Sequence, residues 1–228
     1  MSKPYQAVIF DLDGTLLNTL DDLHAAVNHT MSALNHPLRT KDEVRSFVGD
    51  GIKELIKRSL PEGNTSDMVP AYDIFCRYYS EHNAQKTLPY AGMVPLVQRL
   101  RQSGVQTAVV TNKTDFAANA LCDKFFPDCF HTVIGARDNL AKKPSPDGVY
   151  QALSQMNVQR AHAVYVGDSD VDFQTAKNAG LDCVLVSWGF RDRAVLEKLQ
   201  PLAVADDAKS LQKPTVRRGV IRAWVYRN

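Results

Sequence analysis

The chain has 228 residues, of which 44% are hydrophobic and 23% charged, so it can build one sizeable core but scarcely two independent ones. No stretch approaches the roughly 18 consecutive apolar residues of a membrane-spanning helix, and the first residues lack the apolar segment of a secretory signal, so we expect a soluble, cytoplasmic protein with no membrane partner. The net charge is +2, but five basic residues lie in the tail 213–228 and the rest of the chain is acidic overall, which argues against nucleic-acid binding.

Short runs of branched and aromatic residues predict buried strands in the order 7–10, 105–110, 131–134, 163–166 and 183–186. Apolar residues at helical spacing predict helices between and after these strands, around 94–104, 149–156 and 173–180. Because strands alternate with helices, the predicted fold class is α/β, with a Rossmann-like parallel sheet and helices on both of its faces.

The segment 19–87 interrupts this alternation, because it has no convincing strand and several helical patterns. One apolar stripe runs from Leu20 to Leu34, and further patterns follow at 41–48, 52–60 and 68–81. We therefore predict an α/β core domain of residues 1–18 and 88–212, an inserted helical cap domain of residues 19–87, and a basic C-terminal tail of residues 213–228. A hinged cap of this kind can cover a site, although a helical decoration that only stiffens the fold is the alternative.

Polar residues follow three of the predicted strands. The sequence Asp11-Leu12-Asp13-Gly14-Thr15 follows the first strand, Thr111-Asn112 ends the second, and Gly167-Asp168 with Asp172 follows the fourth. Ligands bind beyond the carboxyl ends of strands in open α/β sheets, so we expect these groups to share one crevice.

The carboxylates of Asp11, Asp13, Asp168 and Asp172 would raise one another's pKa values in that crevice unless a cation were bound. Magnesium prefers oxygen ligands and keeps several waters, and it therefore suits this set better than calcium does. A phosphate that enters such a site still needs neutral donors.

The neutral donors are the Thr111 hydroxyl, the Asn112 side chain and the backbone N–H groups near Gly14, where glycine permits close approach. A lysine would come from the segment 142–146, in which two prolines make a stiff approach to the next helix. Lys143 adjoins the first proline and is our choice, with Lys142 as the alternative. A lysine in this place can bridge the nucleophile and the phosphate.

Together these residues resemble the motifs of the haloacid dehalogenase superfamily, over roughly residues 5–211. In motif order, the similar segments are Asp11 to Thr15, Thr111, Lys143, and Gly167-Asp168 with Asp172. The helical insertion is similar to the family's type-one cap. Four shorter segments resemble phosphoglycolate phosphatases in particular: Phe47 to Gly51, Thr111 to Lys113, Lys143 to Pro146, and Ser187 to Arg191.

The resemblance implies a Mg²⁺-dependent phosphomonoester hydrolase that acts through an aspartyl-phosphate. It implies that Asp11 is the nucleophile and that Asp13 is the general acid and base. The metal ligands would be Asp11, the backbone carbonyl of Asp13, and Asp168, while Asp172 would hold the metal's waters or orient Lys143.

The expected partner is a small phosphorylated metabolite, with 2-phosphoglycolate as the first choice. A phosphosugar mutase and another small-phosphate or pyrophosphate hydrolase are the alternatives within the superfamily. A regulatory module that only binds a phospho-ligand is the alternative from another class, but it would not need all four of Asp11, Asp13, Lys143 and Asp168.

The cap would select the rest of the substrate, and Gly49, Asp50 and Gly51 form the predicted loop above the crevice, with a plain turn as the alternative. Arg45, Lys53 and Arg191 are further candidates for contact with a substrate carboxylate. The four cysteines show no C-x-x-C pair and no zinc-like spacing, so we expect free thiols. The chain is expected to be a monomer or homodimer, and the tail to bind an anionic partner, to pack on the body or a second subunit, or to be incidental.

Overall fold

A parallel sheet forms the centre of the computed structural model, which describes residues 5–212, 215–217 and 220–222. The sheet has six strands in the order β5-β4-β1-β6-β7-β8, and every neighbouring pair is parallel. The strands are β1 (Ala7–Phe10), β4 (Gln106–Thr114), β5 (Thr132–Ala136), β6 (Ala163–Gly167), β7 (Asp182–Val186) and β8 (Ala203–Ala205). The predicted α/β fold class is confirmed.

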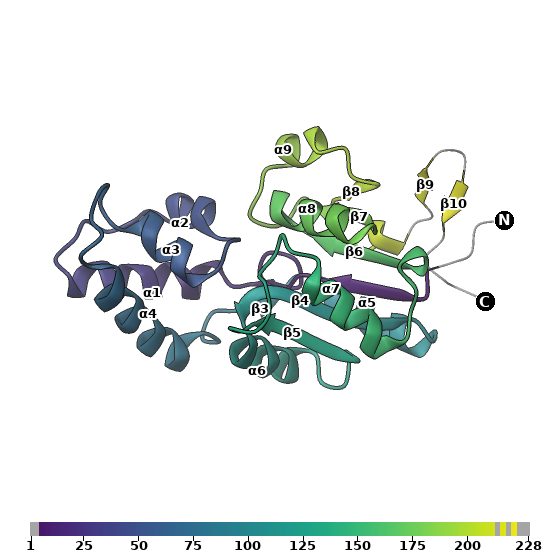
Figure 1. Ribbon diagram of the computed structural model, residues 1–228, viewed down its shortest axis with the longest axis horizontal. Coiled ribbons are helices and arrows are strands. Elements are labelled where there is room, and N and C mark those ends of the chain that lie inside the picture. Colours follow the sequence, from purple (N-terminus) through teal and green to yellow (C-terminus); the bar gives the residue numbers. More distant parts are fainter. Residues whose placement is uncertain (1–4, 213–214, 218–219, 223–228) are drawn as a thin grey trace.

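Helices cover both faces of this sheet (Figure 1). The core helices are α5 (Met93–Gln102), α6 (Asp115–Phe125), α7 (Asp147–Met156), α8 (Asp170–Ala179) and α9 (Arg193–Lys198). Val8 and Phe10 belong to the apolar cluster that contains α5 and α6, whereas Ala7 and Ile9 belong to the cluster that contains α7, α8 and α9. Successive residues of a strand point to opposite faces, so the four residues of β1 contribute to both halves of the core.

Four helices form the cap, which is inserted between the first strand, β1, and the core helix α5. They are α1 (Leu20–Ala33), α2 (Lys41–Phe47), α3 (Ile52–Ser59) and α4 (Met68–His82). The cap has an apolar cluster of its own, to which Phe190 of the core contributes its ring. Figure 1 shows the cap beside the sheet, on the side where β1 runs into it.

A short pair of antiparallel strands marks the two places where the chain crosses between core and cap. Strands β2 (Leu17–Asn18) and β3 (Leu88–Pro89) pair in antiparallel fashion there. The buried carboxylate of Asp22 accepts hydrogen bonds from the backbone N–H groups of Lys86 and Thr87, at 3.0 and 2.9 Å. This carboxylate fastens the first cap helix to the returning chain.

Two short 3₁₀ turns, Arg160–His162 and Ser210–Gln212, and an antiparallel pair, β9 (Thr215–Arg217) with β10 (Val220–Arg222), complete the described elements. The predictions about the basic tail concern side chains that lie outside the described residues. Within the described part of the chain, no helix has the length and apolarity that crossing a bilayer requires.

Candidate active site

The chain that leaves β1 carries the first two carboxylates of the site. The Asp11 N–H donates to the Val166 carbonyl at 2.9 Å, so the sheet still holds the backbone at this residue. Just beyond Asp13, Gly14 adopts a positive φ of +83°, and its N–H donates to the Leu17 carbonyl at 2.9 Å. We predicted this N–H as a phosphate donor, but the structure uses it to close the turn.

A buried lysine connects the first and fourth motifs. The Lys143 ammonium lies 2.8 Å from a carboxylate oxygen of Asp11 and 2.7 Å from one of Asp172. The hydroxyl of Tyr165 is 3.2 Å from the same ammonium and donates to the Val110 carbonyl. Lys142, the alternative lysine, is exposed, so Lys143 is the one that pairs with Asp11.

Asp172 uses both of its carboxylate oxygens inside the protein. One oxygen faces Lys143, and the other accepts from the backbone N–H groups of Asp168 and Ser169, each at 3.1 Å. This second set belongs to the N-terminal cap of α8, in which the Ser169 side chain accepts in return from the Asp172 N–H. The contacts favour the interpretation in which Asp172 orients Lys143.

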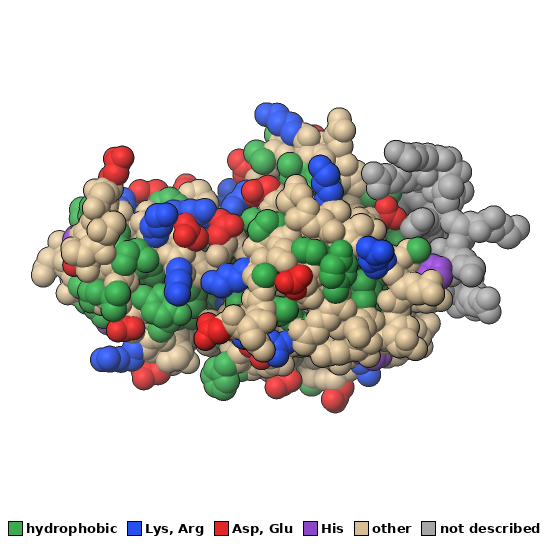
Figure 2. Space-filling view, viewed as in Figure 1, with side chains coloured by type: hydrophobic (Ala, Val, Ile, Leu, Met, Phe, Trp, Pro, Cys, Tyr) green, Lys and Arg blue, Asp and Glu red, His purple; other side chains and the backbone are tan. Residues whose placement is uncertain are grey.

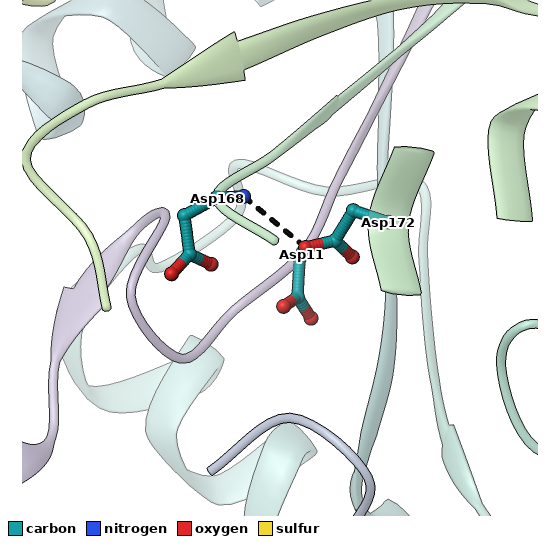
Figure 3. A group of neighbouring side chains, drawn as sticks. All are labelled: Asp11, Asp168 and Asp172. Atoms are coloured by element: carbon teal, nitrogen blue, oxygen red, sulfur yellow. Dashed lines mark hydrogen bonds between the residues drawn. The ribbon is translucent and has the colours of Figure 1, made fainter. Parts of the chain in front are cut away.

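Asp168 lies opposite Asp11 and is held by a hydroxyl and a backbone N–H. The Thr15 hydroxyl donates to one carboxylate oxygen at 3.1 Å, and the Phe190 N–H donates to the other at 2.7 Å. A Cβ atom added at Gly14 or at Gly189 would come within 2.3 Å of this side chain, so only glycine leaves room for it. In Figure 3 the carboxylates of Asp11 and Asp168 point to the same side, while that of Asp172 turns toward the Asp168 backbone.

These carboxylates form an electrostatically costly group. Burial, together with the charges of Asp172 and Asp13, raises the pKa of Asp11 to about 7, although Lys143 acts in the opposite direction. Burial and the charges of Asp172 and Asp11 also raise the pKa of Asp168 well above its ordinary value. Ligand oxygens of Asp11, Asp168 and Asp172 lie within 4.8 Å of one another, and a hard divalent cation fits a donor set of this kind.

A second buried ion pair holds Asp13. The Lys113 ammonium, whose side chain is 3% exposed, lies 3.0 and 3.1 Å from the two carboxylate oxygens of Asp13. It also donates to the hydroxyl of Tyr79, from cap helix α4, at 2.8 Å. Burial lowers the pKa of Lys113, but the Asp13 charge and the Tyr79 hydroxyl outweigh it and raise the pKa above the usual value. Burial raises the pKa of Tyr79 to about 12.

Thr111 and Asn112 lie in β4 and are both buried. Asn112 was predicted to bind phosphate, but its amide is used by the backbone: it donates to the carbonyls of Gly49 at 3.0 Å and Lys143 at 3.1 Å, and it accepts from the Lys143 N–H at 2.8 Å. The side chain therefore couples the cap loop to the segment that carries the lysine. The Thr111 hydroxyl accepts from the Lys113 N–H and lies on the wall of the cavity described below.

The predicted cap loop reaches the site through its glycines. Gly49 and Gly51 line the cavity, whereas the Asp50 carboxylate turns to Arg58 of the cap, 2.6 Å away, and is not part of the lining. Arg191 donates to the Val48 carbonyl at 2.9 Å and so ties this loop to the core.

The other two predicted cations do not reach the cavity. Arg45 contacts the Gly189 carbonyl and the carboxylate of Asp192, both of the core, and Lys53 is exposed. The face of the molecule drawn in Figure 2 carries Lys and Arg side chains on the cap and at the boundary between cap and core.

A cavity of about 50 Å³ lies between core and cap. Its core wall holds the charged and polar groups, and its cap wall is mostly apolar. The lining residues are Asp11, Asp13, Thr111, Asn112, Lys113, Asp168, Ser169, Phe190 and Arg191 from the core, and Leu23, Val48, Gly49, Gly51, Ile52, Leu55 and Tyr79 from the cap.

Fold and site together define a capped α/β protein in which buried lysines hold carboxylates at the wall of a cavity between core and cap. The chain belongs to the haloacid dehalogenase-like hydrolase family, whose model matches residues 8–186. The resemblance found in the sequence motifs is thereby confirmed.

Curated and solved relatives agree with this assignment. The chain is 34% identical to a phosphoglycolate phosphatase of Rhodobacter capsulatus, over 96% of this chain and 98% of that protein. A crystal structure from Lactobacillus delbrueckii subsp. bulgaricus, named as a candidate phosphoglycolate phosphatase, is 31% identical with a TM-score of 0.87 and covers 92% of this chain and 97% of its own. The structure of CbbY from Rhodobacter sphaeroides, in complex with phosphate, is 26% identical with a TM-score of 0.71, over 91% of this chain and 96% of that one.

Three residues of the site had no role in the sequence prediction: Lys113, Tyr79 and Tyr165. Lys113 stood within a quoted motif, and its position directly after Thr111-Asn112 was a usable signal. The two tyrosines gave none, because each sits in an apolar pattern that predicts a core residue, although its hydroxyl contacts a lysine of the site.

Proposed function

We propose that this protein is a Mg²⁺-dependent phosphomonoester hydrolase that acts through an aspartyl-phosphate on Asp11, with 2-phosphoglycolate as its substrate. The observation that carries the proposal is the pair of neighbouring carboxylates, Asp11 and Asp13, each held by its own buried lysine at the wall of a cavity under the cap. The curated relatives that bear the name phosphoglycolate phosphatase support the choice of substrate.

In the first step, a carboxylate oxygen of Asp11 forms a bond to phosphorus while the bond between phosphorus and the ester oxygen breaks. Asp13 gives its proton to the departing oxygen. In the second step Asp13 takes a proton from a water, whose oxygen forms a bond to phosphorus while the bond between phosphorus and the Asp11 oxygen breaks, so that phosphate is released and Asp11 is free again. Lys143 offsets the negative charge that gathers on the phosphoryl oxygens, because its ammonium already contacts Asp11.

The carboxylates of Asp11 and Asp168, with the backbone carbonyl of Asp13, would hold the magnesium ion. The fit rests on charge: while Asp13 is ionised, four carboxylates and two lysines leave the site with two uncompensated negative charges, which one divalent cation balances. When bound, such an ion would supply Lewis-acid polarisation of the phosphoryl oxygens.

Two further properties belong to this proposal. A cavity of about 50 Å³ favours a small substrate over a bulky phosphosugar, since a single water already needs roughly 10–15 Å³ of a cavity. All four cysteines are free, and this supports a cytoplasmic location.

A phosphate-release screen tests the proposal. The purified chain is supplied with 2-phosphoglycolate, several sugar phosphates and pyrophosphate, each with Mg²⁺ and with a chelator. We expect Mg²⁺-dependent release from 2-phosphoglycolate and its loss in Asp11→Asn, with folding of the variant checked by circular dichroism. Release from sugar phosphates or pyrophosphate alone points to a sister activity, and activity retained in Asp11→Asn removes the nucleophile.

A further inference from the structure

Lys113 has contacts that the proposed chemistry does not require. Lys143 already compensates Asp11, and neither attack on phosphorus nor release of the alcohol calls for a second lysine. Yet Lys113 is buried, lies on the cavity wall, and joins Asp13 of the core to Tyr79 of the cap. Taking the Lys113 ammonium out of water is costly even though it pairs with Asp13, so its placement at the cavity wall calls for a role beyond that pair.

The Tyr79 hydroxyl keeps an unused donor at the cavity wall, because it accepts from Lys113 and donates to none of the described residues. Lys113 directs its three donors to the two carboxylate oxygens of Asp13 and to the Tyr79 hydroxyl. One contact to Asp13 is enough to keep that ion pair. An anion in the cavity can therefore accept from the Tyr79 hydroxyl and, in place of one Asp13 oxygen, from Lys113.

The other cations near the cavity are already occupied. Lys143 lies between Asp11 and Asp172, on the phosphoryl side. Arg191 also lines the cavity, but its guanidinium donates to two carbonyls of the cap and pairs with Asp170. Among the described lining residues, Lys113 is thus the cation next to the proposed general acid.

The distances match a substrate whose second anionic group lies one carbon away from the ester oxygen. A proton passes from Asp13 to that oxygen when the two are about 3 Å apart. In an O–CH₂–COO⁻ unit a carboxylate oxygen lies about 3 Å from the ester oxygen, given ordinary bond lengths. Lys113 lies 3.0 Å from Asp13. The Asp13 carboxylate, the ester oxygen, the substrate carboxylate oxygen and the Lys113 ammonium can therefore lie at the corners of one quadrilateral with sides of about 3 Å.

The apolar cap residues of the cavity wall favour a substrate carboxylate that lies next to Lys113. Leu23, Ile52 and Leu55 of the cap line the cavity there and cannot solvate a carboxylate. We propose that Lys113, assisted by the Tyr79 hydroxyl, binds the carboxylate of the substrate and thereby determines specificity for phosphorylated 2-hydroxy acids. The inference rests on the proposed function and extends it to recognition of the alcohol that leaves phosphorus.

A comparison of two substrates tests this role. 2-Phosphoglycolate carries the carboxylate, and 2-hydroxyethyl phosphate replaces it with a hydroxymethyl group of similar size. We expect Lys113→Met to lower the ratio of kcat/KM between the two substrates by about tenfold to a hundredfold, chiefly through a higher KM for 2-phosphoglycolate, because a charge-assisted hydrogen bond is lost. Tyr79→Phe should lower the same ratio by a smaller factor, and it serves as the test if Lys113→Met does not fold.

Lys142→Met is the matched control, because it removes the same charge near the loop at Gly51 without touching Asp13 or Tyr79. This variant should keep the wild-type ratio. If Lys113→Met lowers kcat/KM equally for both substrates, the inference is overturned, and Lys113 serves only to position Asp13. If the wild-type protein releases phosphate from no phosphomonoester, the proposed function itself fails, so the two failures are distinguishable.

Discussion

Replacing Asp172 with asparagine tests the internal support of the site without reference to any substrate. The carboxylate is fully buried and has two sets of partners: Lys143 and Tyr165 face one oxygen, and the N–H groups of Asp168 and Ser169 face the other. Asparagine has the same shape but only one acceptor oxygen, and its NH₂ group is a donor. In either orientation this NH₂ group therefore meets groups that also donate.

The expected cost follows from this mismatch. Removing one partner of a buried ion pair costs about 3–5 kcal/mol, and we expect a value near the lower end because Lys143 keeps Asp11. For a chain of this length the change corresponds to a fall in Tm of about 6–20 °C. Urea unfolding followed by circular dichroism measures the free energy.

Asp170→Asn is the control, because Asp170 lies in the same helix, is exposed, and pairs with Arg191 at the surface. Its effect should stay below about 1 kcal/mol. If the free energy of unfolding of Asp172→Asn lies within about 1 kcal/mol of the wild-type value, Asp172 does not support the site as the contacts indicate.

Three further outcomes are expected. Without metal, the raised pKa of Asp11 lowers the stability of the folded protein by an amount that grows as the pH rises from 3.8 to about 7. Added Mg²⁺ should therefore raise Tm more at about pH 8 than at about pH 5.5. Equal Tm shifts at the two pH values, or an undiminished Tm shift in Asp168→Asn, contradict this prediction. Gly14→Ala should cost about 2–4 kcal/mol in chemical unfolding, because φ is +83° and the new Cβ would lie 2.3 Å from Asp168; a neutral result refutes the close packing. Asp22→Asn should weaken the hinge contacts to Thr87 and speed limited proteolysis of the crossing segment, whereas an unchanged cleavage rate shows that these bonds do not hold the cap.

The predicted elements succeeded where a continuous apolar run, or an apolar stripe at helical spacing, was long enough to stand out. The run 7–10 gave β1 with its observed bounds, and the helical stripe that starts at Leu20 gave α1. Strand β8 was missed because its three residues form too short an apolar run to stand out. Helix α6 was missed because Phe116, 82% exposed, places a large apolar side chain on the solvent face and obscures the stripe.

The site could be predicted as far as strand ends determine position. Asp11, Asp168 and Lys143 meet because parallel strands end at the same edge, which sequence spacing indicates. Partners that depend on the direction of single side chains could not be predicted. The amide of Asn112 binds backbone carbonyls, and carbonyls have no signature in a sequence; Lys113 finds Asp13 across 100 positions of the chain.

The cap and the reactive groups are tied together by the same core segment. In β4, the Asn112 side chain contacts both the cap loop at Gly49 and the backbone of Lys143. The Lys113 side chain contacts both Tyr79 of the cap helix α4 and the carboxylate of Asp13. If the cap moves away, Lys113 must exchange the Tyr79 hydroxyl for water, and Asn112 loses its bond to Gly49. Cap position and the environment of the proposed acid are therefore linked, so variants of either side chain should change substrate selection and catalysis together, whereas variants on the outer face of the cap should change neither.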